Sequence, residues 1–179
     1  MLQRTRNAVM AIGLGLVLTL ATTSVAAQDV TSNAMPGVDF SKFHTYKWIT
    51  IEGAKYPNQI VNQQIQDAVN SQLSAKGLTL TTAENADLDV GYQVAVQQQQ
   101  EWNAYGTGGY RWGGGMASAQ SSTINIGTLV LDLYDPSSKQ LVWTGRATKT
   151  LNPSKDPEKN QKNLNKAMAK LLKNYPPKS

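Results

Sequence analysis

The sequence predicts an α+β domain in which an antiparallel sheet of about five strands carries two helices on one face, in the order β-α-β-β-β-β-α. Three observations lead to this prediction. Alternating apolar and polar residues, typical of half-buried strands, recur between residues 78 and 151. Two other stretches repeat apolar residues three and four apart, as amphipathic helices do. Most of the predicted strands follow one another directly, which favours antiparallel pairing.

Residues 1–27 have the organisation of a secretory signal peptide. Arg4 and Arg6 precede an apolar run over residues 8–20, and small residues before the predicted cleavage site at Ala27 suit a signal peptidase. The run is shorter than the about 20 residues that a transmembrane helix needs. The chain also has no cysteine to which a lipid could be attached. We therefore expect a soluble periplasmic product without stable membrane insertion.

The remaining residues 28–179 have the length of one domain and can bury a core without disulfides. Loss of Arg4 and Arg6 with the signal leaves 15 basic against 12 acidic residues, a formal net charge of +3. In an exported protein this mild surplus favours an envelope protein, a glycan or an anionic lipid surface as partner, and disfavours nucleic acid. No cofactor is predicted.

The first half of the domain predicts a strand followed by a helix. Residues 28–41 are rich in Thr, Ser, Asn, Pro and Gly and predict a flexible lead-in to the single domain of residues 42–179. Residues 43–51 concentrate aromatic and β-branched side chains and predict the first strand. From Asn58 the spacing becomes helical, and Gly77 suits a left-handed stop. The apolar positions of this helix are Val61, Ile65, Ala68, Val69 and Leu73.

The middle of the chain predicts two strands and a long connection. Residues 78–81 predict a short strand, and a half-buried strand follows over residues 88–96. Residues 97–120 contain four consecutive glutamines and many glycines, and predict a long loop or hairpin tip outside the core. The half-buried strand is expected to point one set of side chains at the core: Leu88, Val90, Tyr92, Val94 and Val96.

Residues 122–134 and 140–151 predict a hairpin joined by a polar turn. Ile124 and Ile126 differ in parity from the leucines that follow them, so we expect a β-bulge near Gly127-Thr128 to return all of them to one face. With Tyr134 opposite Gln140, the expected cross-strand pairs are Leu133 with Leu141, Leu131 with Trp143, and Leu129 with Gly145.

The last element is predicted to be a helix. Asp156 is suited to cap it, Pro157 to occupy its first position, and Glu158 to lie at the positive end of the helix dipole. Pro176-Pro177 ends it. Its apolar stripe consists of Leu164, Ala167, Met168, Leu171 and Leu172.

Six short segments, spread over nearly the whole mature chain, form a characteristic series. They are Asp39-Phe40-Ser41-Lys42-Phe43 with Thr45-Tyr46 and Trp48, Leu73-x-x-Lys76-Gly77, Ala86-Asp87-Leu88-Asp89-Val90, Gly127-Thr128-Leu129-Val130-Leu131-Asp132-Leu133, Leu141-Val142-Trp143-Thr144-Gly145, and Tyr175-Pro176-Pro177. In order and spacing they resemble the uncharacterised bacterial envelope proteins grouped as domain of unknown function 4136. The resemblance implies no activity and no catalytic residues. Many members look like lipoproteins with a cysteine at the cleavage site, which this chain lacks.

The sequence shows no catalytic constellation. His44 is the only histidine and has no cysteine or second imidazole as partner, so a structural or surface role is expected. The serines lack the G-x-S-x-G and S-x-x-K patterns of activated nucleophiles. Turn capping and a solvated sheet face are expected for the acidic candidates, with a carboxylate pair of the glycosidase kind as the alternative. These candidates are Asp87, Asp89, Asp132 and Asp135.

The glycine-rich part of the 97–120 loop holds a cluster of aromatic side chains. It lacks the Gly-Lys-Ser/Thr ending of a phosphate-binding loop, and it does not lead from a strand into a helix. Exposed aromatic rings can stack on sugars or anchor protein partners. The competing interpretation is a spacer between two strands. The candidate binding residues are Trp102, Tyr105, Tyr110, Arg111 and Trp112.

A row of lysines forms a second candidate surface on the last predicted helix, opposite its apolar stripe. Such a row is commonly the solvated face of a helix packed on a sheet, and the alternative is contact with anionic lipid headgroups or cell-wall polymer. Its members are Lys159, Lys162, Lys166, Lys170 and Lys173.

These observations favour a non-enzymatic binding or interaction domain of the periplasm. A periplasmic hydrolase with a carboxylate site and a passive structural or stress-related envelope protein are the alternatives.

Overall fold

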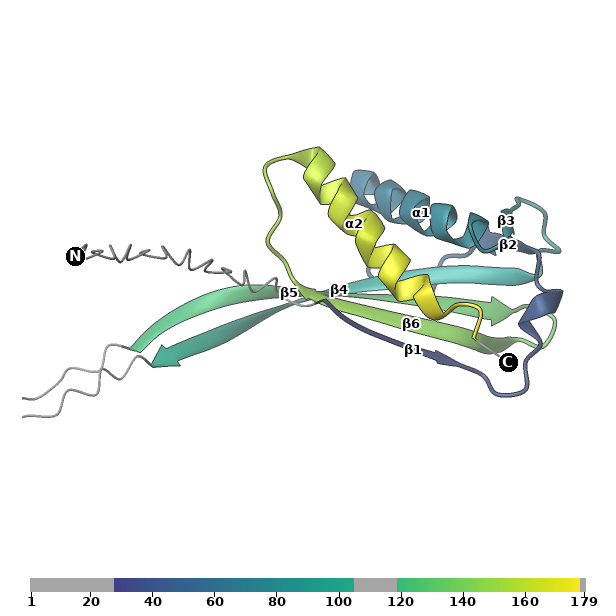
Figure 1. Cartoon of the computed structure of the whole chain (residues 1–179), viewed down its shortest axis with the longest axis horizontal. Helices are drawn as coiled ribbons and strands as arrows, with labels where there is room; N and C mark the ends of the chain where they lie inside the picture. The colour runs from purple at the N-terminus through teal and green to yellow at the C-terminus, as the bar shows by residue number, and fades with distance from the viewer. Residues whose placement is uncertain (1–27, 105–118, 178–179) are drawn as a thin grey trace, which may run out of the picture.

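A computed structural model describes residues 28–104 and 119–177. In it the chain forms a six-stranded sheet with two helices on one face (Figure 1). Its strand order is β1-β6-β5-β4-β2-β3. The strands are β1 (Asp29–Ala34), β2 (Thr45–Trp48), β3 (Thr79–Leu80), β4 (Leu88–Ala104), β5 (Ala119–Asp135) and β6 (Gln140–Thr150), and the helices are α1 (Gln59–Ser74) and α2 (Pro157–Leu171). The α+β class is confirmed.

The sheet is mixed, and the prediction of an antiparallel sheet with about five strands is wrong in this respect. β2 runs parallel to both β3 and β4, whereas the pairs β1–β6, β6–β5 and β5–β4 are antiparallel. The cause lies in the connection through α1. A helix between two strands carries the chain back across the sheet, so that β3 starts from the same end as β2.

The sixth strand is β1, which lies in the segment predicted to be a flexible lead-in. All six of its residues pair with β6, from Asp29 opposite Thr148 to Ala34 opposite Trp143. Val30 and Ala34 pack against the core. The strand carries only these two apolar residues among polar ones, because its outer edge and one face meet solvent, and so its sequence resembles a loop.

Both helices begin just after residues whose side chains cap them. The side chain of Asn58 accepts a hydrogen bond from the backbone N–H of Val61 at the start of α1, and Gly77 adopts φ +88° after its end. Asp156 accepts from the N–H groups of Glu158 and Lys159 at the start of α2. Their apolar stripes face the sheet, with Ile65, Ala68, Val69 and Leu73 buried on α1 and Met168 and Leu171 on α2.

The core lies between the helices and one face of the sheet. Leu88, Val90 and Tyr92 of β4 are buried there as predicted, together with Leu129, Leu131 and Leu133 of β5 and Trp143 of β6. The prediction fails toward the end of the alternating run, because Val94 is only half-buried and Val96 is 62% exposed. At this point β4 has left the region that the helices cover.

The hairpin of β5 and β6 forms, but its bulge lies elsewhere than predicted. Leu133 pairs with Trp143 and Tyr134 with Leu141, so Val142 is an extra residue in β6. Leu131 therefore faces Gly145 instead of Trp143. The β4–β5 register runs unbroken past Gly127. No bulge is needed there, because Ile124 and Ile126 belong to the opposite face from the three leucines.

Beyond the body, β4 and β5 continue together as a two-stranded ribbon (Figure 1). Residues 98–104 pair with residues 119–125, from Gln98 opposite Asn125 to Ala104 opposite Ala119. We refer to these two segments as the arm. Ten residues of the predicted 97–120 loop, 97–104 and 119–120, therefore belong to strands, and the other fourteen, 105–118, lie outside the described structure.

Within the described residues, no helix is long and apolar enough to cross a membrane.

Candidate functional site

The arm contains part of the predicted aromatic cluster. Trp102 lies in β4, where its backbone pairs with Ser121 of β5. The other four members, Tyr105, Tyr110, Arg111 and Trp112, lie outside the described residues, as does the predicted cleavage site at Ala27. The arm backbone can therefore be analysed as a binding surface, while the tip of the hairpin stays a prediction.

Both long edges of the arm lack a neighbouring strand among the described residues. On one side, the last backbone contact to β4 is the hydrogen bond from the Val94 N–H to the Lys55 carbonyl (3.0 Å). On the other side, β6 ends opposite Ile126, and the Leu151 N–H donates to the Asn125 carbonyl (2.7 Å). Beyond these points every second N–H and C=O of each strand points outward, because a strand in a two-stranded ribbon uses only half of its backbone groups in pairing.

The arm also lacks the features that keep strand edges from pairing with other chains. Natural edge strands are made short or carry prolines, bulges or charges, especially lysines. The arm has no proline and only one charged residue, Glu101, and its register is regular. The body edges differ: β3 has two residues, and β1 is followed closely by Pro36. The edges of the body are thus protected against pairing with strands of other chains, whereas the described edges of the arm are not.

The arm side chains at 98–100 and 123–125 are uncharged, and all but Ile124 are polar. Gln98, Gln99 and Gln100 are exposed, and opposite them stand Asn125, Ile124 and Thr123. A two-stranded ribbon is marginally stable in water. A further strand would satisfy its outer backbone groups and add no charge repulsion at this surface.

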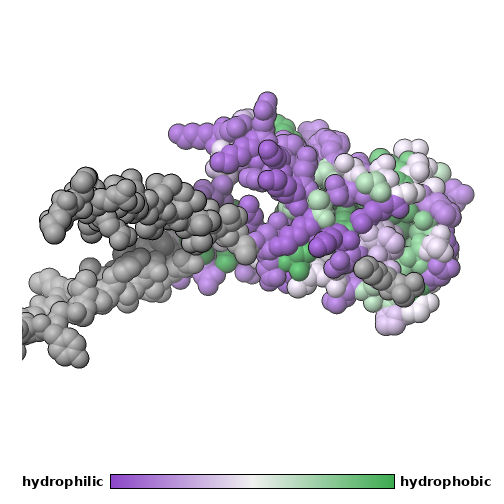
Figure 2. All heavy atoms as spheres, in the orientation of Figure 1, coloured by the Kyte–Doolittle hydropathy of each residue, from purple (hydrophilic) through white to green (hydrophobic). Residues whose placement is uncertain are grey.

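All five predicted lysines are exposed; four lie on α2, and Lys173 lies in the short 3-10 helix Leu172–Asn174 that follows it. Figure 2 shows hydrophilic residues along the visible side of the helix layer. The apolar side of α2 is fixed by the buried Met168 and Leu171 against the sheet. We call Lys159, Lys162, Lys166, Lys170 and Lys173 the lysine face.

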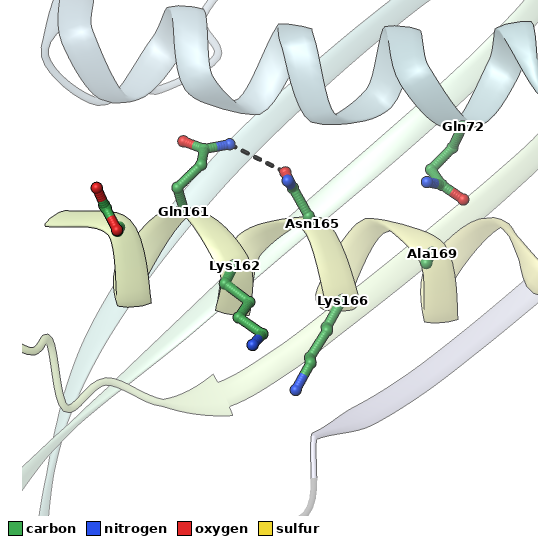
Figure 3. A pocket seen from close by; sticks show the side chains of 7 residues that line it. Gln72, Gln161, Lys162, Asn165, Lys166 and Ala169 are labelled. Atoms are coloured by element: carbon green, nitrogen blue, oxygen red, sulfur yellow. Dashed lines mark hydrogen bonds between the residues drawn. The ribbon is translucent and has the colours of Figure 1, made fainter.

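Beside the lysine face, a shallow polar groove of about 560 Å³ runs between the two helices (Figure 3). Gln161 and Asn165 of α2 point toward α1, and the Gln161 amide donates to the Asn165 side chain at 2.9 Å. Gln72 approaches from α1, whereas Lys162 and Lys166 point to the other side of α2. Lys162 and Lys166 also line this groove, so these two lysines border it on the side of α2 away from α1.

Two of the four candidate carboxylates hold loops together. Asp87 accepts hydrogen bonds from the backbone N–H groups of His44 and Thr45 at 2.9 Å each, and these bonds lower its pKa. Asp135 accepts from the Ser137 hydroxyl and from Lys42 Nζ, both of which lower its pKa. Both carboxylates are therefore ionised near neutral pH and already accept hydrogen bonds from the protein, which suits turn capping. An ionised carboxylate has no proton to donate, so neither suits the role of general acid at this pH.

The other two carboxylates lie on the helix-free face of the sheet. Asp132 is only 7% exposed and accepts from the Thr144 hydroxyl at 2.6 Å. Asp89 lies 3.6 Å from Lys47 Nζ. The pKa of Tyr134 is raised, first by burial and then by the charge of Asp132. Neither carboxylate lines any of the larger grooves found in the described residues.

His44 is exposed and borders a groove of about 1040 Å³ formed by the 34–44 segment and Pro176-Pro177. Among the described residues, no three His, Cys, Asp or Glu side chains are arranged to hold a metal ion.

Sequence reasoning missed the arm edges and the inter-helix groove. The arm lies in a polar, glutamine-rich segment that shows no alternation, so its strands have no hydrophobic signal. A usable signal was the absence of proline and of charge from residues 94–100 and 119–126, since loops of this length normally contain such residues.

Two solved structures show the same fold at low sequence identity. A PDZ domain protein from Parabacteroides distasonis matches with a TM-score of 0.55 and 14% identity over 85% of this chain and 37% of that chain. The present chain thus spans much less than half of its length. PelC from Paraburkholderia phytofirmans, described as a dodecamer, matches with a TM-score of 0.50 and 17% identity over 82% of this chain and 95% of that chain.

A comparison with curated protein sequences finds no match. A family model, described as a domain of unknown function, matches residues 30–177, a range that includes most of β1 and the whole arm. The chain therefore belongs to the DUF4136 family.

Proposed function

We propose that the chain is an exported, non-enzymatic binding domain of the cell envelope, and that its arm binds an extended segment of an envelope protein by strand addition. The observation that carries this proposal is the pair of unprotected arm edges, whose outer backbone groups lack partners in the described structure. Strand addition supplies affinity through main-chain hydrogen bonds and specificity through alternate side chains.

The arm is long enough to receive such a partner. Seven residue pairs at about 3.3 Å each give a ribbon of roughly 23 Å, comparable to a typical strand. Its side chains present amides and hydroxyls, so a partner strand with amide, hydroxyl or small apolar side chains fits best. The predicted aromatic residues at the hairpin tip would add anchors at one end of the same surface.

The electrostatics of the acidic residues support a binding domain over the hydrolase alternative. Asp87 and Asp135 are held ionised by structural hydrogen bonds, and their lowered pKa values are the opposite of what a general acid needs. Asp89 and Asp132 lie on a sheet face outside the larger grooves, where a sugar ring could not be enclosed.

The test uses a variant that lacks the arm. Residues 98–125 are replaced by Asn-Gly, which joins the paired residues Gln97 and Ile126 through a two-residue hairpin turn. We expect the full-length chain to give a discrete formaldehyde-crosslinked complex in intact cells, and the shortened chain to give none.

A second pair of variants separates the arm edge from the aromatic tip. Gln98→Lys combined with Gln100→Lys places charges on the arm and leaves the tip intact, while Gln140→Lys with Ser138→Lys places the same charges at the opposite end of the sheet. We expect only the arm variant to lose the complex. Full retention of the complex by the shortened chain would reject the arm as the binding element and favour a passive structural role.

A further inference from the structure

The lysine face is presented rigidly on one flank of α2. Four of its members lie on α2, whose opposite side is buried through Met168 and Leu171, and Lys173 follows the buried Leu172 in a short 3-10 helix. The helix cannot roll without exposing these side chains to water. From Lys159 to Lys173 the row spans about 21 Å at the usual helical rise of about 1.5 Å per residue.

The charges of the lysine face are not neutralised within the described part of the chain. The ion pairs found there join Lys42 to Asp135 and Lys47 to Asp89, and neither involves α2. The acidic residues nearest in sequence are Asp156 and Glu158, at the N-terminal end of the helix. Asp156 caps the helix with its side chain. Glu158 lies one turn before Lys162 and lines the same groove, whereas Lys166, Lys170 and Lys173 form no ion pair within the described residues.

The chain enters the body beside this row. Lys170 Nζ donates a hydrogen bond to the Gln28 carbonyl at 2.5 Å. Gln28 is the first residue that the structure describes, and the sequence before it contains the apolar run of residues 8–20. The residue that follows the predicted cleavage site therefore lies beside the lysine face.

From these observations we infer that the lysine face docks the domain onto an anionic phospholipid surface. The linear row of lysines, which form no ion pair within the described residues, fits a flat layer of headgroup phosphates. The lysine face acts independently of the arm, which extends away from the sheet at the end of the β4–β5 ribbon (Figure 1).

The test measures binding of the full-length protein to vesicles of phosphatidylglycerol and phosphatidylcholine in a 3:7 ratio, by co-sedimentation at low salt. The variant replaces Lys162, Lys166 and Lys170 by glutamine. Each lysine near an anionic surface contributes about five-fold to binding, so the expected loss is on the order of 100-fold. Raising the salt to physiological strength should weaken binding of the unmodified protein, because the contacts are exposed.

A matched variant controls for net charge. Lys55→Gln, Lys76→Gln and Arg146→Gln remove the same charge from elsewhere on the body, and the expected change is less than two-fold. Pure phosphatidylcholine vesicles measure any binding that does not depend on lipid charge and that all variants share. An equal loss in both triple variants would reject a dedicated surface. Unchanged binding of the variant with Lys162, Lys166 and Lys170 replaced would also reject a dedicated surface, provided that circular dichroism shows that this variant is folded.

A soluble competitor separates lipid from polymer. Polyglutamate at equal charge concentration should displace the protein from the vesicles poorly, because it does not present a flat array of phosphates. Complete displacement would overturn the assignment to a lipid surface and point to an anionic polymer. The chain without residues 98–125 should bind the vesicles as the full chain does, so failure of the arm proposal leaves this one testable.

Discussion

At the scale of single residues, Asp135 fixes the turn between β5 and β6 to the start of the domain. One carboxylate oxygen accepts from the Ser137 hydroxyl and backbone N–H and from the Ser138 N–H, and the other lies 2.9 Å from Lys42 Nζ. Asp87 fixes the start of β2 in the same way. Both aspartates therefore stabilise the fold by accepting hydrogen bonds from other parts of the protein, without being fully exposed to solvent.

We predict that Asp135→Asn lowers the free energy of unfolding at pH 7 by about 1–2 kcal/mol, because the charge-assisted bonds are lost while the turn can still be capped. The folded-state pKa of Asp135 lies below the ordinary value of 3.8, so its contribution is present above pH 3.8 and is lost as the pH falls below it. The difference between the urea midpoints of variant and unmodified protein should be nearly the same at pH 7 and pH 4, and should narrow as the pH falls from 4 toward 2. Glu52→Gln, at an exposed position, is the control and should change little.

A second residue-scale prediction concerns Asn70, whose side-chain oxygen accepts from the Tyr46 hydroxyl (2.8 Å) and the Trp48 ring N–H (3.0 Å). Burial raises the pKa of Tyr46 to about 12, which keeps it a neutral donor. Asn70→Ala leaves two donors without a partner and should cost about 2–4 kcal/mol. Asn163→Ala, on the exposed side of α2, should be nearly neutral. Equal urea midpoints for the two variants would contradict this account.

At the scale of elements, Gly145 lets β6 and α2 approach each other. A Cβ at this position would collide with the Trp143 ring and would come within 2.9 Å of Leu171 Cδ1. The bulge at Val142 lets two consecutive residues of β6, Val142 and Trp143, both be buried. The Trp143 ring then lies over Gly145, two residues further along the strand.

We expect Gly145→Ala to destabilise the fold by about 1–3 kcal/mol, since both neighbours are buried and cannot move freely. Gly127→Ala is the matched comparison in β5. There the neighbour is Leu151, at 2.6 Å but 43% exposed, so it can turn into solvent at lower cost. Thermal unfolding of both variants checks the order, and a larger loss at Gly127 would contradict it.

The helices and strands also show which parts of the fold can be predicted from the sequence alone. Both helices were predicted, together with the stop at Gly77 and the cap at Asp156, because these residues act within one turn of where they stand; the cap at Asn58 was not predicted. β1 and the parallel pairing of β2 were missed, because they depend on partners distant in sequence. The parity switch after Ile126 was seen but attributed to a bulge, since sequence cannot show that the two faces of β5 meet different surroundings along its length.

At the scale of the whole molecule, the body and the arm differ in the interactions that specify their structure. The core is closed by contacts among the two helices and the part of the sheet below them, and none of the arm residues 98–100 and 123–125 belongs to it. The candidate binding site was only partly predictable for this reason. Its aromatic composition was visible in the sequence, whereas its strands are specified by pairing between β4 and β5 and not by an apolar pattern.

We predict that the chain with residues 98–125 replaced by Asn-Gly folds with a melting temperature within a few degrees of the full chain. Every pair between β6 and β5, up to Ile126 and Thr150, is retained in this variant. Circular dichroism and thermal unfolding check this expectation. A large loss of stability would mean that the arm belongs to the body.

The central claim, that the arm edge receives a partner strand, is tested most directly by photo-crosslinking in living cells from single positions. A photoreactive residue at Gln99, exposed on the arm, is compared with one at Gln140, exposed at the far end of the sheet. The account predicts a discrete crosslinked protein from position 99, absent from position 140 and lost when Gln98→Lys and Gln100→Lys are added. Absence of a product at position 99, or the same products from both positions, would contradict it.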